Sequence, residues 1–149
     1  MRVEILESPF DPLHEVAKHQ ELLSAGQFGA MAVFVGTMRD FNEGDTVTSM
    51  VLEHYPEMTQ QHLLDLARIV ADQHNLTDLL MIHRVGEIHP GEAIVLVAVW
   101  SAHRAAAFEA CEAMVEDLKS KAPFWKKEQL VEGESRWVEY NTAGPRTTA

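Results

Sequence analysis

The alternation of apolar and polar residues along the chain predicts strands and helices in a mixed order. Residues 2–7 alternate as in a half-buried strand, whereas residues 30–35 and 93–100 are continuously apolar, as in buried strands. Further strands are predicted at 47–54, 79–85, 125–131 and 135–139. The polar segment 36–45 contains two glycines and is expected to be a loop, and the strands on either side of it could pair as a long hairpin.

Helices are expected between these strands. Asp11 followed by Pro12 is typical of a helix start, and this first helix is expected to reach about Leu23. Residues 57–74 form the second, with Asn75 as its C-cap and one apolar face at helical spacing, made by Leu63, Leu66, Ala67 and Val70. With a third helix near the end of the chain, the order of elements indicates an α+β fold with a mostly antiparallel sheet.

The third helix is expected at 102–121, capped by Ser101 and ended by Pro123. Its predicted buried face consists of Ala105, Phe108, Cys111, Val115 and Leu118. In the strand at 30–35, the simplest interpretation places three large apolar residues in the core, namely Met31, Phe34 and Val35.

Length and charge limit the class of protein. At 149 residues the chain is expected to form one domain over residues 1–140, followed by a disordered tail at 141–149. The formal charge of −11 argues against binding to nucleic acid or to an anionic membrane. The sequence has no long apolar run, its first residues do not resemble a signal peptide, and its single cysteine excludes an internal disulfide. The expected compartment is therefore the reducing cytoplasm.

Four of the five lysines lie within nine residues, at positions Lys119, Lys121, Lys126 and Lys127. Crowded ammonium groups repel one another, so each is more easily deprotonated, and a deprotonated lysine can act as a nucleophile or a general base. The same cluster would attract an anionic substrate. A solvated helix end is the alternative, because lysines in a last helical turn complement the macrodipole. That alternative explains Lys126 and Lys127 poorly, since Pro123 and two aromatic residues intervene.

Two further basic segments lie at the ends of predicted elements. His103 and Arg104 open the third helix, whose free N–H groups form a natural anion site, although both could equally face solvent or pair with acids such as Glu109. Arg39 follows Gly36 at the exit of a buried strand and could clamp an anion, but for this segment alone an ordinary surface arginine is favoured. If the three basic segments converge, they form an anion pocket with an activated lysine.

Other kinds of site are not indicated by the sequence. Cys111 lies on the predicted apolar face of its helix, so a packed cysteine is expected rather than a nucleophile. The eight histidines do not show the spacing of metal ligands. The sequence contains neither a glycine-rich phosphate loop nor a Gly-x-Ser-x-Gly elbow. We therefore expect neither a metal nor a cofactor.

Four segments resemble the large, catalytic subunit of molybdopterin synthase. They are FVGTMRD at 34–40, HRVGEIHPGE at 83–92, SAHR at 101–104 and LKSKAPFWKKE at 118–128. The resemblance implies an α/β hammerhead fold and a cytoplasmic sulfur transferase of molybdenum cofactor biosynthesis. Its substrate would be cyclic pyranopterin monophosphate (precursor Z), converted to molybdopterin. The sulfur donor would be the C-terminal Gly-Gly thiocarboxylate of a small ubiquitin-like subunit, in a heterotetramer built on a homodimer of large subunits.

The same resemblance implies roles for individual residues. Lys119 would contact the thiocarboxylate and the reacting pterin side chain, and Lys126 would act as a general acid/base or bind substrate. The implied substrate-binding residues are Thr37, Met38, Arg39, His103, Arg104, Lys127 and Glu128. The alternative function is a non-catalytic scaffold domain that binds anions in the same basic pocket. An unrelated acyl- or phosphoryl-transfer enzyme with a lysine base is less favoured.

Overall fold

The computed structural model describes residues 1–131 and 133–138. Its body is a four-stranded sheet in the order β1 (Arg2–Leu6), β5 (Asp78–Arg84), β7 (Ala93–Ser101) and β2 (Ala30–Thr37). β1 and β5 are parallel, and the other pairs are antiparallel. β7 lies inside the sheet with both faces covered, which explains why its apolar residues are continuous rather than alternating.

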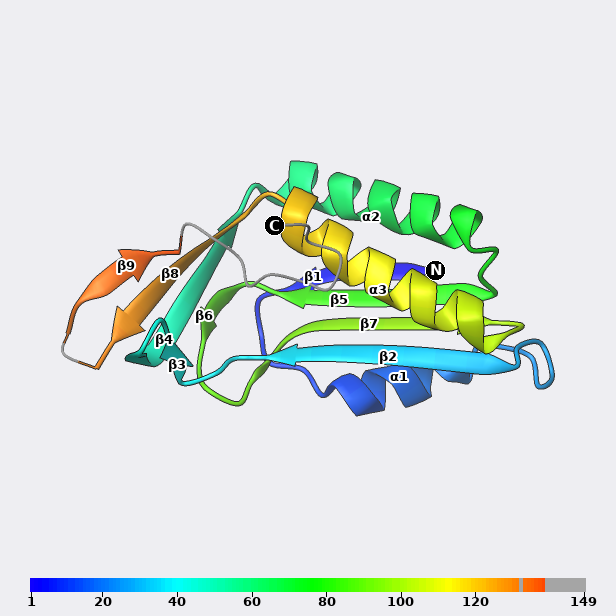
Figure 1. The fold of residues 1–149 in the computed structure, drawn as a ribbon, viewed down its shortest axis with the longest axis horizontal. Helices are drawn as coiled ribbons and strands as arrows, with labels where there is room; N and C mark the ends of the chain where they lie inside the picture. Colours follow the sequence, from blue (N-terminus) through cyan, green and yellow to red (C-terminus); the bar gives the residue numbers. More distant parts are fainter. Residues whose placement is uncertain (132, 139–149) are drawn as a thin grey trace.

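Helices cover both faces of this sheet (Figure 1). α1 (Pro12–Gln20) packs on one face, where Val16 meets Leu80, Leu96 and Trp100. α2 (Pro56–Gln73) and α3 (Arg104–Lys121) lie side by side on the other face over a larger apolar core. The described helices are too short or too polar to cross a membrane.

A second, smaller sheet lies at one end of the body (Figure 1). It consists of β3 (Phe41–Asn42), β4 (Asp45–His54), β8 (Phe124–Leu130) and β9 (Ser135–Trp137), and β6 (Gly86–Ile88) pairs with β4. Its apolar core is separate and contains Met38, Val47, Met50, Leu52, Val85 and Ile88. Because β8 follows α3 after two residues, the end of α3 is held at the junction of the two sheets.

The predicted α+β class, three helices and mostly antiparallel pairing are confirmed. Asp11 caps α1, since its side chain accepts hydrogen bonds from the N–H groups of Leu13 and His14, but this helix ends at Gln20 rather than near Leu23. The predicted apolar face of α2 is buried. Its C-cap is His74, and Asn75 follows in the left-handed region with φ of 50°.

The predicted N-cap of the third helix is wrong, and its predicted buried face is confirmed only for Cys111, Val115 and Leu118. Ser101 is the last residue of β7, its hydroxyl donates to the carbonyl of His103 at 2.6 Å, and His103 is the N-cap. Ala105 and Phe108 are exposed. Small side chains let α3 pack closely on β2 and β7, so the buried face runs through Ala107, Ala110, Cys111, Ala113, Met114, Val115 and Leu118.

The predicted long hairpin does not form. β2 pairs with β7 over residues 30–37, whereas β4 pairs with β3, β6 and β8 in the other sheet. β2 is an edge strand, so Met31 is 44% exposed instead of buried in the core. The predicted tail at 141–149 and the last residue of the strand predicted at 135–139 lie outside the described residues.

Candidate active site

Two adjoining cavities lie at the junction of the two sheets, with volumes of about 260 and 220 Å³. The first has an aromatic wall that includes His83, Phe124 and Trp125. The second is polar and is lined by groups that include Arg39, Asn42 and Glu128. The residues that line both cavities are Thr37, Ile94, Lys119, Lys126 and Val138. The two lysines therefore stand where the cavities meet.

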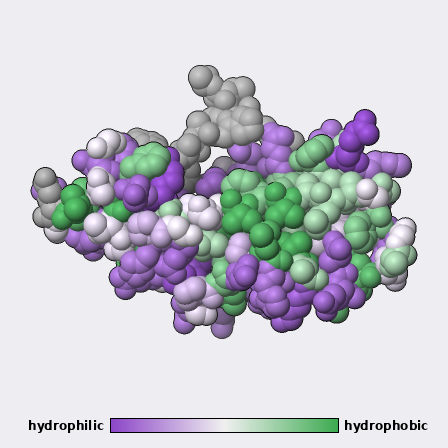
Figure 2. Space-filling model, turned by 90° about the horizontal axis from the view of Figure 1, so that it is seen from below, coloured by the Kyte–Doolittle hydropathy of each residue, from purple (hydrophilic) through white to green (hydrophobic). Residues whose placement is uncertain are grey.

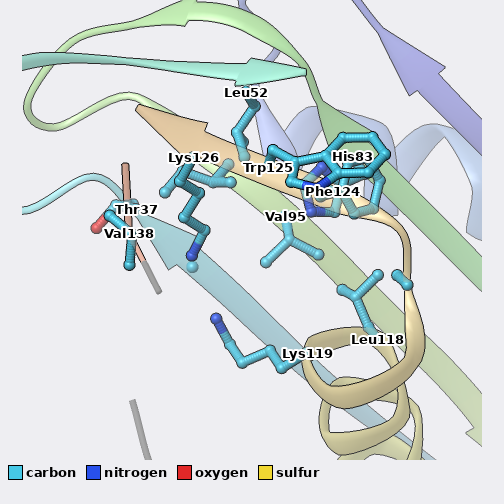
Figure 3. Close-up of a pocket in the computed structure, with 13 residues that line it drawn as sticks. Thr37, Leu52, His83, Val95, Leu118, Lys119, Phe124, Trp125, Lys126 and Val138 are labelled. Carbon is cyan, nitrogen blue, oxygen red and sulfur yellow. The ribbon is translucent and has the colours of Figure 1, made fainter. Parts of the chain in front are cut away.

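The connection between α3 and β8 brings these two lysines together. Lys119 lies in the last turn of α3, and Lys126 lies near the start of β8. Only Ala122 and Pro123 separate the two elements, because Ala122 has an extended backbone and proline cannot continue a helix. Figure 3 shows the two ammonium groups pointing toward one another across the cavity.

The other two clustered lysines point elsewhere. Successive residues of a strand face opposite sides, so Lys127 is exposed while Lys126 faces the cavity. The Lys127 ammonium lies 5.6 Å from the centre of the Trp137 ring and outside the lining of both cavities. Lys121 is exposed and pairs with Asp117 at 3.2 Å.

Burial lowers the pKa values of both cavity lysines. For Lys119 the main cause is loss of hydration; the charge of Arg39 lowers the pKa further, and Glu116 opposes the change. For Lys126, burial comes first and the charge of Lys119 second, and together they lower the pKa to about 8 despite the nearby Glu128 carboxylate. The sequence predicted a lowered pKa from cationic neighbours; the direction agrees, but burial is the larger cause.

Replacing Lys126 with methionine is expected to stabilise the protein at pH 7. The folded-state pKa of about 8 lies below the ordinary 10.5, so the unfolded chain binds the proton more tightly. Removing this charge should raise the free energy of unfolding by roughly 1–3 kcal/mol at pH 7. The advantage should shrink between pH 8 and 10.5, as folded wild-type protein releases the proton. Urea unfolding at pH 7 and pH 10 measures both effects, and equal advantages at the two pH values would contradict the prediction.

His83 forms a neutral part of the first cavity. Its buried ring stacks on Phe124, with ring centres 4.1 Å apart and planes 13° apart. Nδ1 lies 2.8 Å from the carbonyl oxygen of Arg84, so Nδ1 carries the hydrogen and Nε2 is left as an acceptor. Burial lowers the His83 pKa to about 3, and the charges of Lys126 and Lys119 act in the same direction. In the sequence, segment 83–92 contributed to the family resemblance, but no role was predicted for His83.

Glu128 is a buried carboxylate that is already engaged. It accepts hydrogen bonds from the Asn42 amide at 3.1 and 3.2 Å and from Arg136 Nε at 3.0 Å. Arg136 also donates to Asp45 at 2.8 Å and to the carbonyl of Asn42 at 2.9 Å. Glu128 therefore joins β3, β8 and β9 around the polar cavity. Arg136 was missed in the sequence because two of its partners, Asn42 and Asp45, lie more than ninety positions away along the chain.

The segment after β2 supplies the other predicted residues on this side. Thr37, Met38 and Arg39 all line the second cavity. Met38 is buried, whereas Arg39 is exposed, with its guanidinium 5.0 Å from the centre of the Phe41 ring. Arg39 and the two inward lysines therefore line the same cavity, so two of the three basic segments converge.

His103 and Arg104 lie at the opposite end of α3 from Lys119. Both are exposed, and Lys119 lies fifteen positions after Arg104 along the helix, which corresponds to about 22 Å. Within one chain, the third basic segment therefore does not join the other two.

The described residues suggest neither a cysteine nucleophile nor a metal centre elsewhere in the molecule. Cys111 is buried among core residues, and burial raises its thiol pKa to about 11, as expected for a packed cysteine. Over residues 1–131 and 133–138, no three His, Cys, Asp or Glu side chains are grouped as metal ligands would be.

Comparison with known proteins gives consistent matches. Residues 7–121 match the family described as MoaE protein. A molybdopterin synthase catalytic subunit from Ralstonia nicotianae is 46% identical over 99% of this chain and 82% of its own length. A molybdopterin biosynthesis MoaE protein from Burkholderia ambifaria has a similar structure, with a TM-score of 0.78 and 38% identity over 97% of this chain and 92% of that one. Molybdopterin synthase from Staphylococcus aureus gives a TM-score of 0.82 and 27% identity, over 94% and 98% of the two chains.

Proposed function

The chain belongs to the MoaE protein family, and we propose that it is the catalytic subunit of a molybdopterin synthase. In this role it transfers sulfur to cyclic pyranopterin monophosphate to form molybdopterin. The observation that carries the proposal is the facing pair of Lys119 and Lys126, both with lowered pKa values, at the meeting point of two cavities. Relatives named as molybdopterin synthase catalytic subunits support the same assignment.

The sulfur comes from the C-terminal thiocarboxylate of a small ubiquitin-like subunit, whose tail enters the cavity. A half-buried ammonium attracts this anion strongly, because little water screens the charge. Lys119 holds the thiocarboxylate beside the pterin side chain that reacts. Lys126 binds the anionic reactants as a cation and gives up a proton at low cost, because its pKa is about 8.

The polar cavity is the proposed site for the phosphate of the substrate. Arg39 supplies a guanidinium fork that suits phosphate, and Thr37 and Met38 line the approach. Glu128 supports this wall through its hydrogen bonds to Asn42 and Arg136. Lys127 lies outside both cavities, so we assign it no contact with the substrate.

His103 and Arg104 reach the substrate only if a second copy of the chain supplies them. The free edge of β2 offers a way to do so: Met31 and Val33 are exposed along it, and apolar side chains gather on this face of the molecule (Figure 2). If two β2 edges pair antiparallel about a two-fold axis, Ala30 of one copy lies near Thr37 of the other. Ala30 is paired with Ser101, so the partner's basic segment would approach the pocket.

Mixing two inactive variants tests this shared site. Arg104→Ala and Lys119→Ala remove different halves of one site, so each variant alone should have little activity. In a mixed dimer one of the two sites is intact, and co-refolded protein should recover roughly a quarter of wild-type activity, since half of the dimers are mixed and each has one working site. Lack of recovery in dimers shown to be mixed would contradict a site shared between two copies.

The proposed function is tested by reconstitution. Purified protein is mixed with the thiocarboxylated small subunit and cyclic pyranopterin monophosphate, and the dithiolene product is measured. Product formation that depends on both partners is the expected result. A stable complex with the small subunit but no product would favour the non-catalytic scaffold.

A further inference from the structure

The segment 83–92 connects the walls of the two cavities through a continuous set of hydrogen bonds. At one end His83 lines the first cavity and donates to the carbonyl of Arg84. The buried Arg84 guanidinium then reaches one group in β6 and one in the turn that follows it. Nη1 donates to the Glu92 carboxylate at 3.2 Å, and Nη2 donates to the carbonyl of Glu87 at 2.7 Å.

Glu92 closes the turn with its other carboxylate oxygen. Oε1 accepts from the backbone N–H of His89 at 2.7 Å and lies 3.1 Å from His89 Nδ1. These hydrogen bonds, with that from Arg84, lower the pKa of Glu92, so the carboxylate stays charged at neutral pH. Gly91 has a φ of 87°, which favours glycine and lets the chain reverse within four residues.

The turn is hydrogen-bonded to the backbone of Met38, a buried residue that lines the second cavity. The N–H of Met38 donates to the carbonyl of Glu92 at 3.0 Å, and the N–H of Gly91 donates to the carbonyl of Met38 at 2.9 Å. The register of β2 against β7 is irregular between Gly36 and Thr37, and regular pairing stops there. The two hydrogen bonds of Met38 come directly after this point. The next residue is Arg39, so the turn fixes the backbone from which this guanidinium extends.

We propose that Glu92 is a positioning residue that holds Arg39 at the second cavity, by joining Arg84, the turn at 89–92 and the backbone of Met38. This inference rests on the proposed function for the identity of the ligand, but the geometry itself can be tested without activity. Glu92 touches no part of either cavity, so its effect passes through Met38 and Arg39.

The test compares Glu92→Gln with Glu87→Gln, which makes the same substitution in the same segment. The Glu87 side chain is exposed, and its carboxylate lies 3.4 Å from His89 Nε2. Glu92→Gln should lower kcat/KM for cyclic pyranopterin monophosphate roughly ten-fold or more, mainly by raising KM, since small displacements of a binding group cost large factors. Glu87→Gln should leave both constants unchanged.

A double-mutant cycle with Arg39→Ala separates positioning from general destabilisation. If Glu92 acts through Arg39, adding Glu92→Gln to Arg39→Ala should change kcat/KM by less than about two-fold. If Glu92→Gln lowers kcat/KM by the same factor in the presence and in the absence of Arg39, the proposal is overturned. The melting temperatures of wild type, the two single variants and the double variant show how much each substitution changes stability.

Amide hydrogen exchange gives a readout that does not need turnover. In Glu92→Gln the Met38 amide should exchange faster than in wild-type protein, whereas Leu96 and Val97 in the core of β7 should keep their protection. Unchanged exchange at Met38 would overturn the positioning role even if activity fell. If wild-type protein forms no product, the proposed function fails, and the exchange experiment alone decides whether Glu92 holds this backbone.

Discussion

Replacing Lys119 with alanine is expected to lower kcat for sulfur transfer by about 10²- to 10⁴-fold, the usual effect of removing a positioned acid, base or charge. The side chain reaches the meeting point of both cavities from the end of α3, and no other lysine of this helix faces them. The fold should be unaffected, because removing a half-buried ammonium with a lowered pKa also removes a cost of folding. Single-turnover assays with the thiocarboxylated small subunit measure the effect.

Lys121→Ala is the matched control for Lys119→Ala. It removes the same side chain two residues later, from the exposed side of the same helical turn, where Lys121 pairs with Asp117. Exposed ion pairs contribute little, so activity and stability should both stay close to wild type. Near-normal turnover by Lys119→Ala, or similar losses from the two variants, would contradict the proposed role of Lys119 and favour the scaffold.

Lys126→Ala is expected to lower kcat/KM by about 10²-fold or more, through loss of the cation that faces Lys119 across the cavity. Lys127→Ala changes the neighbouring residue of the same strand and should have little effect, because Lys127 faces Trp137 on the other side. Comparing the two variants therefore shows whether activity needs the ammonium in the cavity or only positive charge on β8.

The pH dependence of the wild-type enzyme tests the same lysine. With a pKa of about 8, Lys126 is a cation below this pH and neutral above it. If the cation binds the anionic reactants, kcat/KM should be level below pH 8 and fall up to ten-fold per pH unit above it. This decline should be absent in Lys126→Ala. A rate that rises through pH 8 would instead make Lys126 a general base, and a flat profile with chemistry rate-limiting would exclude both roles.

Local patterns in the sequence predicted much of the site. Pro123 marks the end of α3, and strand alternation in β8 separates Lys126 from Lys127 once the strand is known to begin at Phe124. Without that boundary, crowding predicted easier deprotonation for each of the four lysines, although burial of two of them is the larger influence on pKa. A charge count along the chain does not measure loss of hydration, which depends on the packing of two sheets.

Contacts between distant segments could not be predicted in the same way. The Asn42 partner of Glu128 lies 86 positions earlier in the chain, and the role of Glu92 depends on hydrogen bonds to a residue more than fifty positions earlier. Helical spacing placed Phe108 on the buried face, but alanines on the adjacent face allow closer packing against the sheet. Helical spacing identifies a face, whereas the choice among similar faces depends on the surface against which the helix packs.

The free edge of β2 also affects how the chain behaves in concentrated solution. From Ala30 to Thr37 this strand contains neither a charged residue nor a proline, the two features that most often prevent an edge strand from adding further strands. An unpaired copy therefore presents a template for aggregation. The net charge of −11 opposes such encounters by mutual repulsion, but high salt screens it. Occupation of this edge by a second copy would thus protect solubility as well as complete a site.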